Sequence, residues 1–133
     1  SVNDTPVITI DSTTESFTED STNEGDVVAT YTTTDEDGDN TTVILSDTTN
    51  YALDGNGNVV LTQAGADLVN SNQDLPDFTL TPNDGTVDGD GVDVNPGDTT
   101  SVNDTPVITI DSTTESFIED STNEGDVVAT YTT

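Results

Sequence analysis

Residues 25–46 read GDVVATYTTTDEDGDNTTVILS, and this stretch decides the fold class. Residues 27–32 and 42–46 are rich in Val, Ile and Thr, which are typical of β-strands. Between them, residues 35–40 hold only acids, one Gly and one Asn, a composition typical of turns. The stretch therefore predicts two strands joined by an acidic turn.

Runs of strand length recur along the chain, separated by Asp-Gly, Asn-Gly and Pro-containing turns. They cover residues 7–10, 51–53, 59–62 and 77–81. Residues 86–95 predict a last strand or a strand pair, interrupted by Gly89 and Gly91. Residues 63–72 lack β-branched enrichment and predict either one short helix or an irregular crossover. Short strands at this spacing predict an all-β protein built as a two-sheet β-sandwich.

The predicted core draws on the apolar residues of these segments. They are Ile8, Ile10, Phe17, Val28, Val43, Leu45, Leu53, Leu61, Leu68, Phe78 and Leu80. Only 5% of the chain is aromatic, so this core is thin. We therefore expect bound metal ions to supply part of the stability.

One segment occurs twice. Residues 1–33 return at 101–133 with a single change, from Thr18 to Ile118. A repeat of this length indicates a tandem array of whole domains, because solenoid repeats span only about 20–50 residues. The sequence predicts a complete repeat over residues 1–100 and the first third of the next over 101–133. The two copies could compete for the same place against residues 34–100.

Charge restricts the partners. The chain has 28 acidic residues and no Lys, Arg or His, so its formal net charge is −28 and side-chain salt bridges are impossible. Nucleic acids and anionic membrane surfaces are excluded as direct partners, because binding either requires cationic side chains. Such self-repulsion, with only 29% hydrophobic residues, would also fit disorder. The regular strand pattern instead indicates a fold that depends on bound cations.

The acidic turn predicts calcium ligands. Calcium takes about 6–8 oxygen ligands, and the turn offers Asp35, Asp37, Asp39 and Asn40 within six residues. Without His or Cys, nothing favours a transition metal. The turn is not an EF-hand, because the positions that need Gly and Glu hold Asn40 and Ser46. We predict that several calcium ions bind.

Three further polar groups have two readings each. Residues 54–58 form either a simple hairpin turn or a cation site. Asp88 and Asp90, with Asp93, are either a solvated turn or ligands. Asn3 and Asp4 are either ligands or the turn that starts the first strand.

Motifs in residues 1–85 follow the order of those in cadherin-like repeats. They are Asn3-Asp4-Thr5-Pro6, Glu19, Gly25-Asp26-Val27-Val28, Asp35-Glu36-Asp37 with Asn40, and Pro82-Asn83-Asp84-Gly85. The Leu-Asp-Arg-Glu motif of cadherins has no clear match. The whole repeat is more closely similar to the extender repeats of giant bacterial RTX adhesins.

That resemblance implies an immunoglobulin-like Greek-key sandwich that folds with calcium. It implies an extracellular spacer on the bacterial cell surface, with neighbouring repeats as partners and no small-molecule substrate.

The resemblance also implies ligands at the junctions between repeats. The junction before this repeat would use Asn3, Asp4, Asp35, Asp37, Asn40 and Asp84. The junction after it would use Glu19, Asn103 and Asp104, and Glu119 would serve a later one.

Two other functions compete with the spacer. The runner-up is a binding module, either homophilic or contacting ice through threonines, although the Thr pairs here do not recur at a short period. An enzyme is the least favoured, because His, Cys, Lys and Arg are missing as bases, nucleophiles or oxyanion donors.

Overall fold

The computed structural model describes residues 2–133, which divide into two compact units. The first unit ends at Val102, and the second runs from Asn103 to Thr133. Strands dominate the regular structure, as predicted, and the described part of the first unit has one helix, α1 (Gln63–Asn70). None of the helices described is long and apolar enough to cross a membrane.

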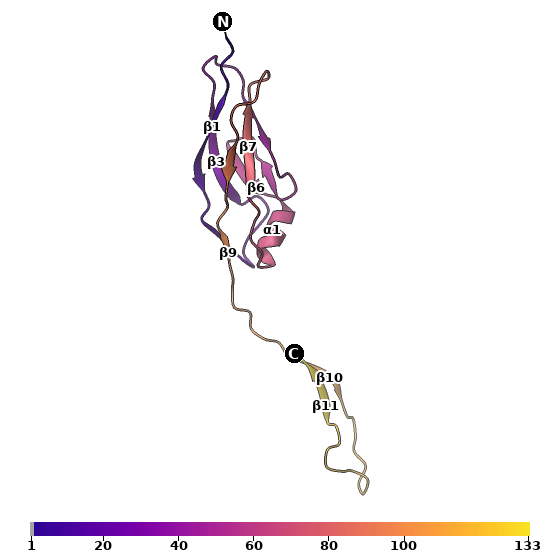
Figure 1. Ribbon diagram of the computed structural model, residues 1–133. Helices are drawn as coiled ribbons and strands as arrows, with labels where there is room; N and C mark the ends of the chain where they lie inside the picture. The colour runs from indigo at the N-terminus through magenta and orange to yellow at the C-terminus, as the bar shows by residue number, and fades with distance from the viewer. Residues whose placement is uncertain (1) are drawn as a thin grey trace. The chain divides into compact units, whose positions relative to one another are not determined.

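The strands of the first unit form two main sheets (Figure 1). The larger sheet is antiparallel and has the order β1 (Val7–Thr13), β3 (Val27–Thr34), β6 (Asn58–Leu61), β5 (Tyr51–Leu53). The smaller is also antiparallel, with the order β4 (Thr42–Leu45), β7 (Phe78–Asn83), β8 (Val92–Val94). A short parallel pair, β2 (Ser16–Thr18) with β9 (Asp98–Thr100), completes the unit.

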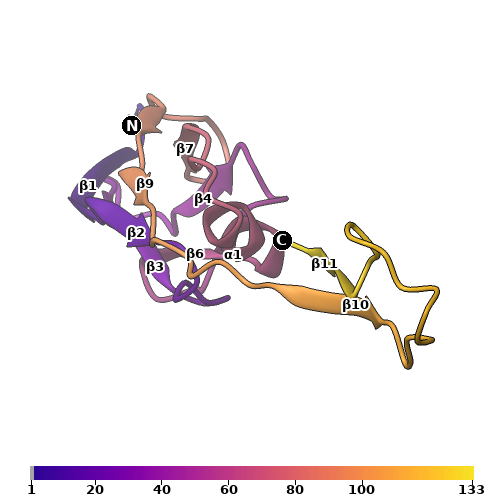
Figure 2. The ribbon, with the colours of Figure 1, turned by 90° about the horizontal axis from the view of Figure 1, so that it is seen from below.

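The two sheets lie on either side of a shared core. Figure 2 shows β1, β3 and β6 on one side of this unit and β4 and β7 on the other. One cluster of buried side chains joins the sheets, with Val28 and Leu61 from the larger sheet and Phe78, Leu80 and Val94 from the smaller. This arrangement is consistent with the predicted β-sandwich.

The predicted core is confirmed in composition. Six predicted residues are buried: Ile8, Phe17, Val28, Leu61, Phe78 and Leu80. The other five pack against them while partly buried: Ile10, Val43, Leu45, Leu53 and Leu68. The prediction missed Tyr51, which is fully buried with its ring 4.2 Å from that of Phe78. Its hydroxyl donates to the Pro76 carbonyl at 2.5 Å, and burial raises its pKa.

A short helix fills the segment for which the sequence allowed either a helix or a crossover. The Thr62 hydroxyl caps α1 by accepting a hydrogen bond from the Gly65 N–H at 3.2 Å. A Cβ at Gly65 would lie 2.3 Å from the Asn50 carbonyl oxygen, so only glycine permits this close approach. Ala66 and Val69 are fully buried and attach the helix to the core.

The short strands were the hardest to predict. Neither β2 nor β9 was predicted, because each has three residues and together they contain one apolar side chain, Phe17. The last predicted segment, 86–95, is a strand only at Val92–Val94. At Gly89 a Cβ would lie 1.9 Å from the Pro6 carbonyl oxygen, so the chain passes close to the start of β1.

The second unit is a hairpin of β10 (Thr109–Thr113) and β11 (Ala129–Thr132). Its strands repeat the pairing of β1 with β3, including the bulge: Ile110 pairs with Tyr131 as Ile10 pairs with Tyr31. Every residue of this unit is exposed.

Candidate metal centre

Three carboxylates meet in the turn between β3 and β4. One oxygen each from Asp35, Asp37 and Asp39 lies within 4.8 Å of the others. The turn itself holds them there, because Oδ1 of Asp35 accepts the N–H groups of Asp37 at 2.8 Å and Asp39 at 3.3 Å. Gly38 has a φ of +76°, a backbone conformation that favours glycine. The acidic turn is therefore organised around Asp35.

The second oxygen of Asp35 has no hydrogen bond. This Oδ2 is buried and lacks a hydrogen-bond partner among residues 2–133. A buried carboxylate oxygen without a partner is costly, and nearby carboxylates add repulsion. Because no Lys, Arg or His exists in the chain, its partner must come from solution, as a cation, a proton or an ordered water.

The segment before β1 reaches this group. The Asp4 backbone N–H donates to Oδ2 of Asp37 at 2.7 Å. The Asn3 amide donates to Oδ2 of Asp84 at 2.8 Å. Both contacts link this segment to the turns that follow β3 and β7. The structure therefore brings Asn3 against Asp84 and Asp4 against Asp37, four of the residues that the resemblance implies as ligands of one junction.

A cleft of about 380 Å³ lies beside the acidic turn. Its lining residues are Asp4, Thr5, Val7, Thr34, Asp35 and Glu36. Sequence reasoning did not select Glu36, because it sought acids at alternate positions; its place between two predicted ligands was the available signal. The cleft gives solvent and ions access to the turn.

The pKa values of Asp39 and Asp84 are shifted in opposite directions. Burial, followed by the charges of Asp35, Asp37 and Asp84, raises the pKa of Asp39. The pKa of Asp84 is lowered by the hydrogen bond from Asn3 and then by the N–H groups of Val87 and Thr86. Asp84 is thus stabilised as an anion, whereas partial desolvation and then the neighbouring charges disfavour the anionic form of Asp39.

The remaining predicted ligands of the first unit lie in exposed loops. Asn40 follows the acidic turn directly and is exposed. Asp88 accepts the Asn83 amide at 2.7 Å beside an isolated bridge between the same two residues, which closes a turn. Asp90 is exposed, and neither Asp88 nor Asp90 belongs to a carboxylate group within residues 2–133. The contact of Asp88 places it in a turn, and the choice between a solvated turn and a ligand stays open for Asp90.

In the turn at residues 54–58, both carboxylate oxygens of Asp54 accept hydrogen bonds from residues of the same turn. Oδ1 of Asp54 accepts the N–H groups of Asn56 at 2.7 Å and Asn58 at 3.2 Å. Oδ2 of Asp54 accepts the Asn58 amide at 2.7 Å, and these bonds lower the pKa of Asp54. This segment is the turn of the hairpin of β5 and β6, and the donors to both oxygens favour the simple-turn interpretation.

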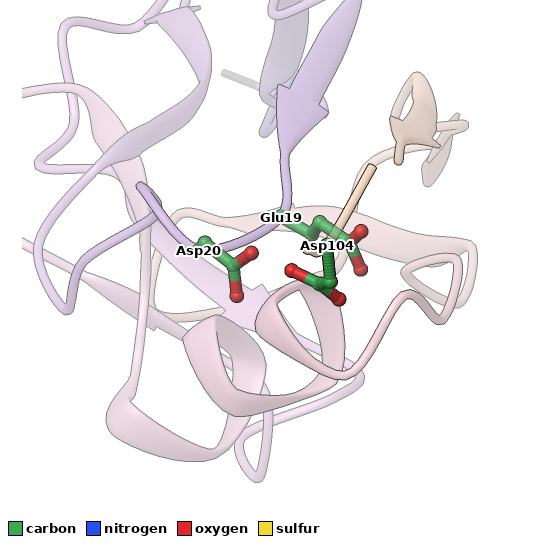
Figure 3. Close-up of side chains that lie close together, drawn as sticks. All are labelled: Glu19, Asp20 and Asp104. Carbon is green, nitrogen blue, oxygen red and sulfur yellow. The ribbon is translucent and has the colours of Figure 1, made fainter. Parts of the chain in front are cut away.

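Glu19 lies at the opposite end of the first unit, in the turn after β2, where Figure 3 shows it with Asp20. The Glu19 side chain is buried, and its Oε1 accepts the Val102 N–H at 2.7 Å. The Glu19 N–H donates to the Thr100 carbonyl at 2.9 Å. Glu19 therefore fixes the last residues of the unit.

Three predicted ligands belong to the second unit. Asn103, Asp104 and Glu119 are all exposed. Glu119 occupies the position that Glu19 has in the first copy, where the same residue is buried.

The donor set of the acidic turn fits a hard cation. It consists of oxygens alone, which suits calcium or magnesium better than a transition metal. The unpartnered oxygen of Asp35 supplies the place for a charge. Comparison of the chain with known protein families, curated proteins and solved structures gives no match. The arrangement of the residues in the acidic turn is therefore the evidence on which a function can be proposed.

Proposed function

We propose that this chain is a calcium-rigidified spacer repeat of a bacterial cell-surface adhesin, similar to the extender repeats of RTX adhesins. In this role it holds a distal binding domain away from the cell and contacts only neighbouring repeats. It performs no catalysis.

The observation that carries the proposal is the buried, unpartnered Oδ2 of Asp35, for which residues 2–133 provide no donor. It lies in a group of three carboxylates in a chain with no cationic side chain. A divalent cation is the ligand that satisfies this oxygen and lowers the repulsion between its neighbours.

Calcium would be held by Asp35, Asp37 and Asp39, with Asn40 near them. The contacts from Asn3 and Asp4 bring the preceding linker to the same region. When bound, the ion supplies two positive charges that couple the linker to the acidic turn. Binding energy of this kind becomes folding energy, because the unfolded chain does not preserve the site.

A second junction is supported by Glu19. Its carboxylate holds the N–H of Val102, and Asn103 and Asp104 follow immediately in sequence. Calcium bound by Glu19, Asn103 and Asp104 would order the linker between successive repeats.

The strand order supports an immunoglobulin-like Greek key. With β2 and β9 set aside, the remaining strands take the letters A to G in chain order. The observed orders β1-β3-β6-β5 and β4-β7-β8 then read A-B-E-D and C-F-G. This is the arrangement of an immunoglobulin constant-type domain. Domains of this class are common in tandem arrays on cell surfaces.

The spacer role is what the resemblance implies, and the repeat and its linkers are consistent with it. Asn-Asp-Thr-Pro stands at residues 3–6 and again at 103–106, so each repeat would begin with the same ligand pair. Extracellular modules commonly bind calcium at about 10⁻⁴–10⁻³ M. An array of such units is stiff outside the cell and slack where calcium is scarce.

The test is a thermal melt followed by circular dichroism in EDTA, in millimolar magnesium and in millimolar calcium. We expect a cooperative β-type transition at the highest temperature in calcium and a large loss of stability in EDTA. Magnesium is the control for general charge screening. Equal melting temperatures under all three conditions would contradict the proposal, because the acids would then be only solvated surface.

A further inference from the structure

One asparagine of the chain is followed directly by glycine: Asn56, in the turn at residues 54–58. In such a pair the backbone nitrogen of the glycine can attack the side-chain amide carbon of the asparagine, because glycine has no Cβ that blocks the approach. Asparagine also belongs to the thermolabile residues. Asn56 is therefore the asparagine whose local sequence most favours loss of its amide.

The structure leaves both reacting groups of this pair without hydrogen bonds. Asn56 is exposed, and its backbone N–H donates to Oδ1 of Asp54 at 2.7 Å, but its side-chain amide has no hydrogen bond within residues 2–133. The Gly57 carbonyl accepts the Tyr31 N–H at 2.9 Å, whereas the Gly57 N–H has no acceptor in the described part of the chain. Neither the attacking nitrogen nor the amide under attack has to break a hydrogen bond first.

Aspartate followed by glycine can form the same ring, and such pairs begin at Asp37, Asp54, Asp84, Asp88 and Asp90. In three of them the glycine N–H is already donated, to the Asp35 carbonyl at 3.1 Å, to Oδ1 of Asn83 at 2.7 Å and to the Pro82 carbonyl at 2.8 Å. An ionised carboxylate is also a much weaker electrophile than a neutral amide. The hydrogen bonds that lower the pKa of Asp54 keep that carboxylate ionised. Asn56 is thus the most reactive of these positions.

We propose that Asn56 is a site of spontaneous deamidation. The Gly57 nitrogen forms a bond to Cγ of Asn56 while the bond from Cγ to Nδ2 breaks, and the Gly57 amide proton leaves with Nδ2 as ammonia. Water then opens the cyclic imide. Attack at Cγ gives aspartate, and attack at the backbone carbonyl carbon gives isoaspartate. Overall one water is consumed and one ammonia is released, with no oxidation or reduction.

The two products differ in their effect on the turn. Aspartate keeps the backbone unchanged, so the N–H groups of residues 56 and 58 still reach Oδ1 of Asp54. Isoaspartate carries the chain through its side chain and adds a methylene group to the backbone. The bonds to Oδ1 of Asp54 at 2.7 and 3.2 Å and the bond from Tyr31 to the Gly57 carbonyl then lose their geometry. Isoaspartate therefore opens the turn between β5 and β6 and its contact with β3.

This modification is independent of the proposed calcium role. It involves the turn at residues 54–58 and uses no carboxylate of the turn at residues 35–39. Failure of one proposal therefore leaves the other unaffected.

The experiment follows the amide of Asn56 over time in the full chain. The folded protein is incubated in calcium buffer at mildly alkaline pH, and samples are quenched in acid. Pepsin then cleaves beside Leu53 and Leu61 and releases a peptide that contains both Asn56 and Asn58. Mass spectrometry with electron-transfer fragmentation should show that Asn56 is converted to aspartate and isoaspartate while Asn58 keeps its amide.

Asn56→Gln is the matched control. Its longer side chain must close a larger ring, which forms far more slowly, so the variant should fold as the wild type does and keep its mass during the same incubation. Hydrogen exchange at the Tyr31 N–H should become faster in the aged wild type and stay unchanged in the aged variant. The proposal is overturned if Asn56 in the folded protein keeps its amide for as long as Asn58 does. Unchanged exchange at Tyr31 in the isoaspartate form would contradict the predicted opening of the turn.

Discussion

Two turns of the first unit share the hydrogen bonds of their first aspartate and differ in the chemistry of their other side chains. In the turns at 35–39 and 54–58, the first Asp accepts the N–H groups of the third and fifth residues through Oδ1. The fourth residue is glycine in both, with φ of +76° at Gly38 and +86° at Gly57. The two turns therefore share these hydrogen bonds and this glycine conformation, but they differ at the second residue, where Gly55 has a φ of +82° and Glu36 has no positive φ.

The fifth residue separates them. Asn58 donates its amide to Oδ2 of Asp54 at 2.7 Å, which completes that turn. Asp39 stands in the same position and cannot donate as an anion, so Oδ2 of Asp35 keeps no partner within the described chain. The comparison indicates that the amide of Asn58, which Asp39 replaces in the other turn, is what gives Oδ2 of the first Asp its donor.

Removing the first aspartate of each turn should give the largest contrast. Asp35→Ala should abolish most of the calcium-dependent gain in unfolding free energy, which is about 2.7 kcal/mol when calcium is a hundredfold above Kd. Asp54→Ala should weaken the fold equally with and without calcium, because it removes only turn hydrogen bonds. Urea denaturation of both variants in calcium and in EDTA measures this. If Asp35→Ala and Asp54→Ala lose the calcium-dependent stabilisation equally, the proposed difference between the two turns is wrong.

The effect of Asp39→Asn on the melting temperature should be opposite in EDTA and in calcium. The new amide can donate to Oδ2 of Asp35, so the variant should melt about 5 °C above wild type in EDTA. In calcium it should melt below wild type, because one anionic ligand is gone. Scanning calorimetry in both buffers gives the two values. A variant that is less stable than wild type in EDTA would show that Oδ2 does not need a donor.

Asn58→Asp is the reverse change and should have a smaller effect. It removes the amide donor to Asp54, so the unfolding free energy in EDTA should fall by about 1 kcal/mol. Calcium should recover part of that loss. Urea titrations in EDTA and calcium provide the measurement, with Asn56→Asp as the control, since only the backbone N–H of Asn56 contacts Asp54. An equal loss of unfolding free energy in Asn58→Asp and Asn56→Asp would show that the added negative charge alone causes the loss.

The pH dependence without calcium should show the smallest effect. The pKa of Asp39 is raised, so its protonation favours the fold, and this contribution is lost as pH rises through its folded pKa. The pKa of Asp84 is lowered, so its contribution is lost as pH falls through its folded pKa. Melting temperature in EDTA should therefore rise on mild acidification from neutral pH and fall again below about pH 4.

Asp39→Asn provides the control for this profile. The variant should lose most of the rise on acidification and retain the fall at lower pH. If the melting temperature of Asp39→Asn rises on acidification as much as that of the wild type, carboxylates other than Asp39 cause the rise.

The sequence predicted the strands whose side chains make the core, because β-branched runs between turns report burial directly. It missed β2 and β9, since a strand of three mostly polar residues carries no pattern of its own. It also left Tyr51 out of the core, because a tyrosine can lie inside only where a partner such as the Pro76 carbonyl is present. That partner becomes visible only in three dimensions.

The acidic turn was selected correctly as the place where carboxylates meet, because close sequence spacing guarantees closeness in a turn. The difference between residues 35–39 and 54–58 was not decided from sequence. It depends on the hydrogen bond from Asn58 to Asp54 and on the burial of one oxygen of Asp35. Composition alone makes both segments acidic, Gly-containing turns.

Exchanging the fifth residues of the two turns tests the central claim most directly. The double variant Asp39→Asn with Asn58→Asp has the same composition and the same net charge of −28 as the wild type. Its calcium affinity should be measured by isothermal titration calorimetry beside that of the wild type. We predict at least a tenfold weaker affinity at the turn of residues 35–39. An isotherm identical to that of the wild type would contradict the account, because calcium binding would then follow total charge and not the geometry of this turn.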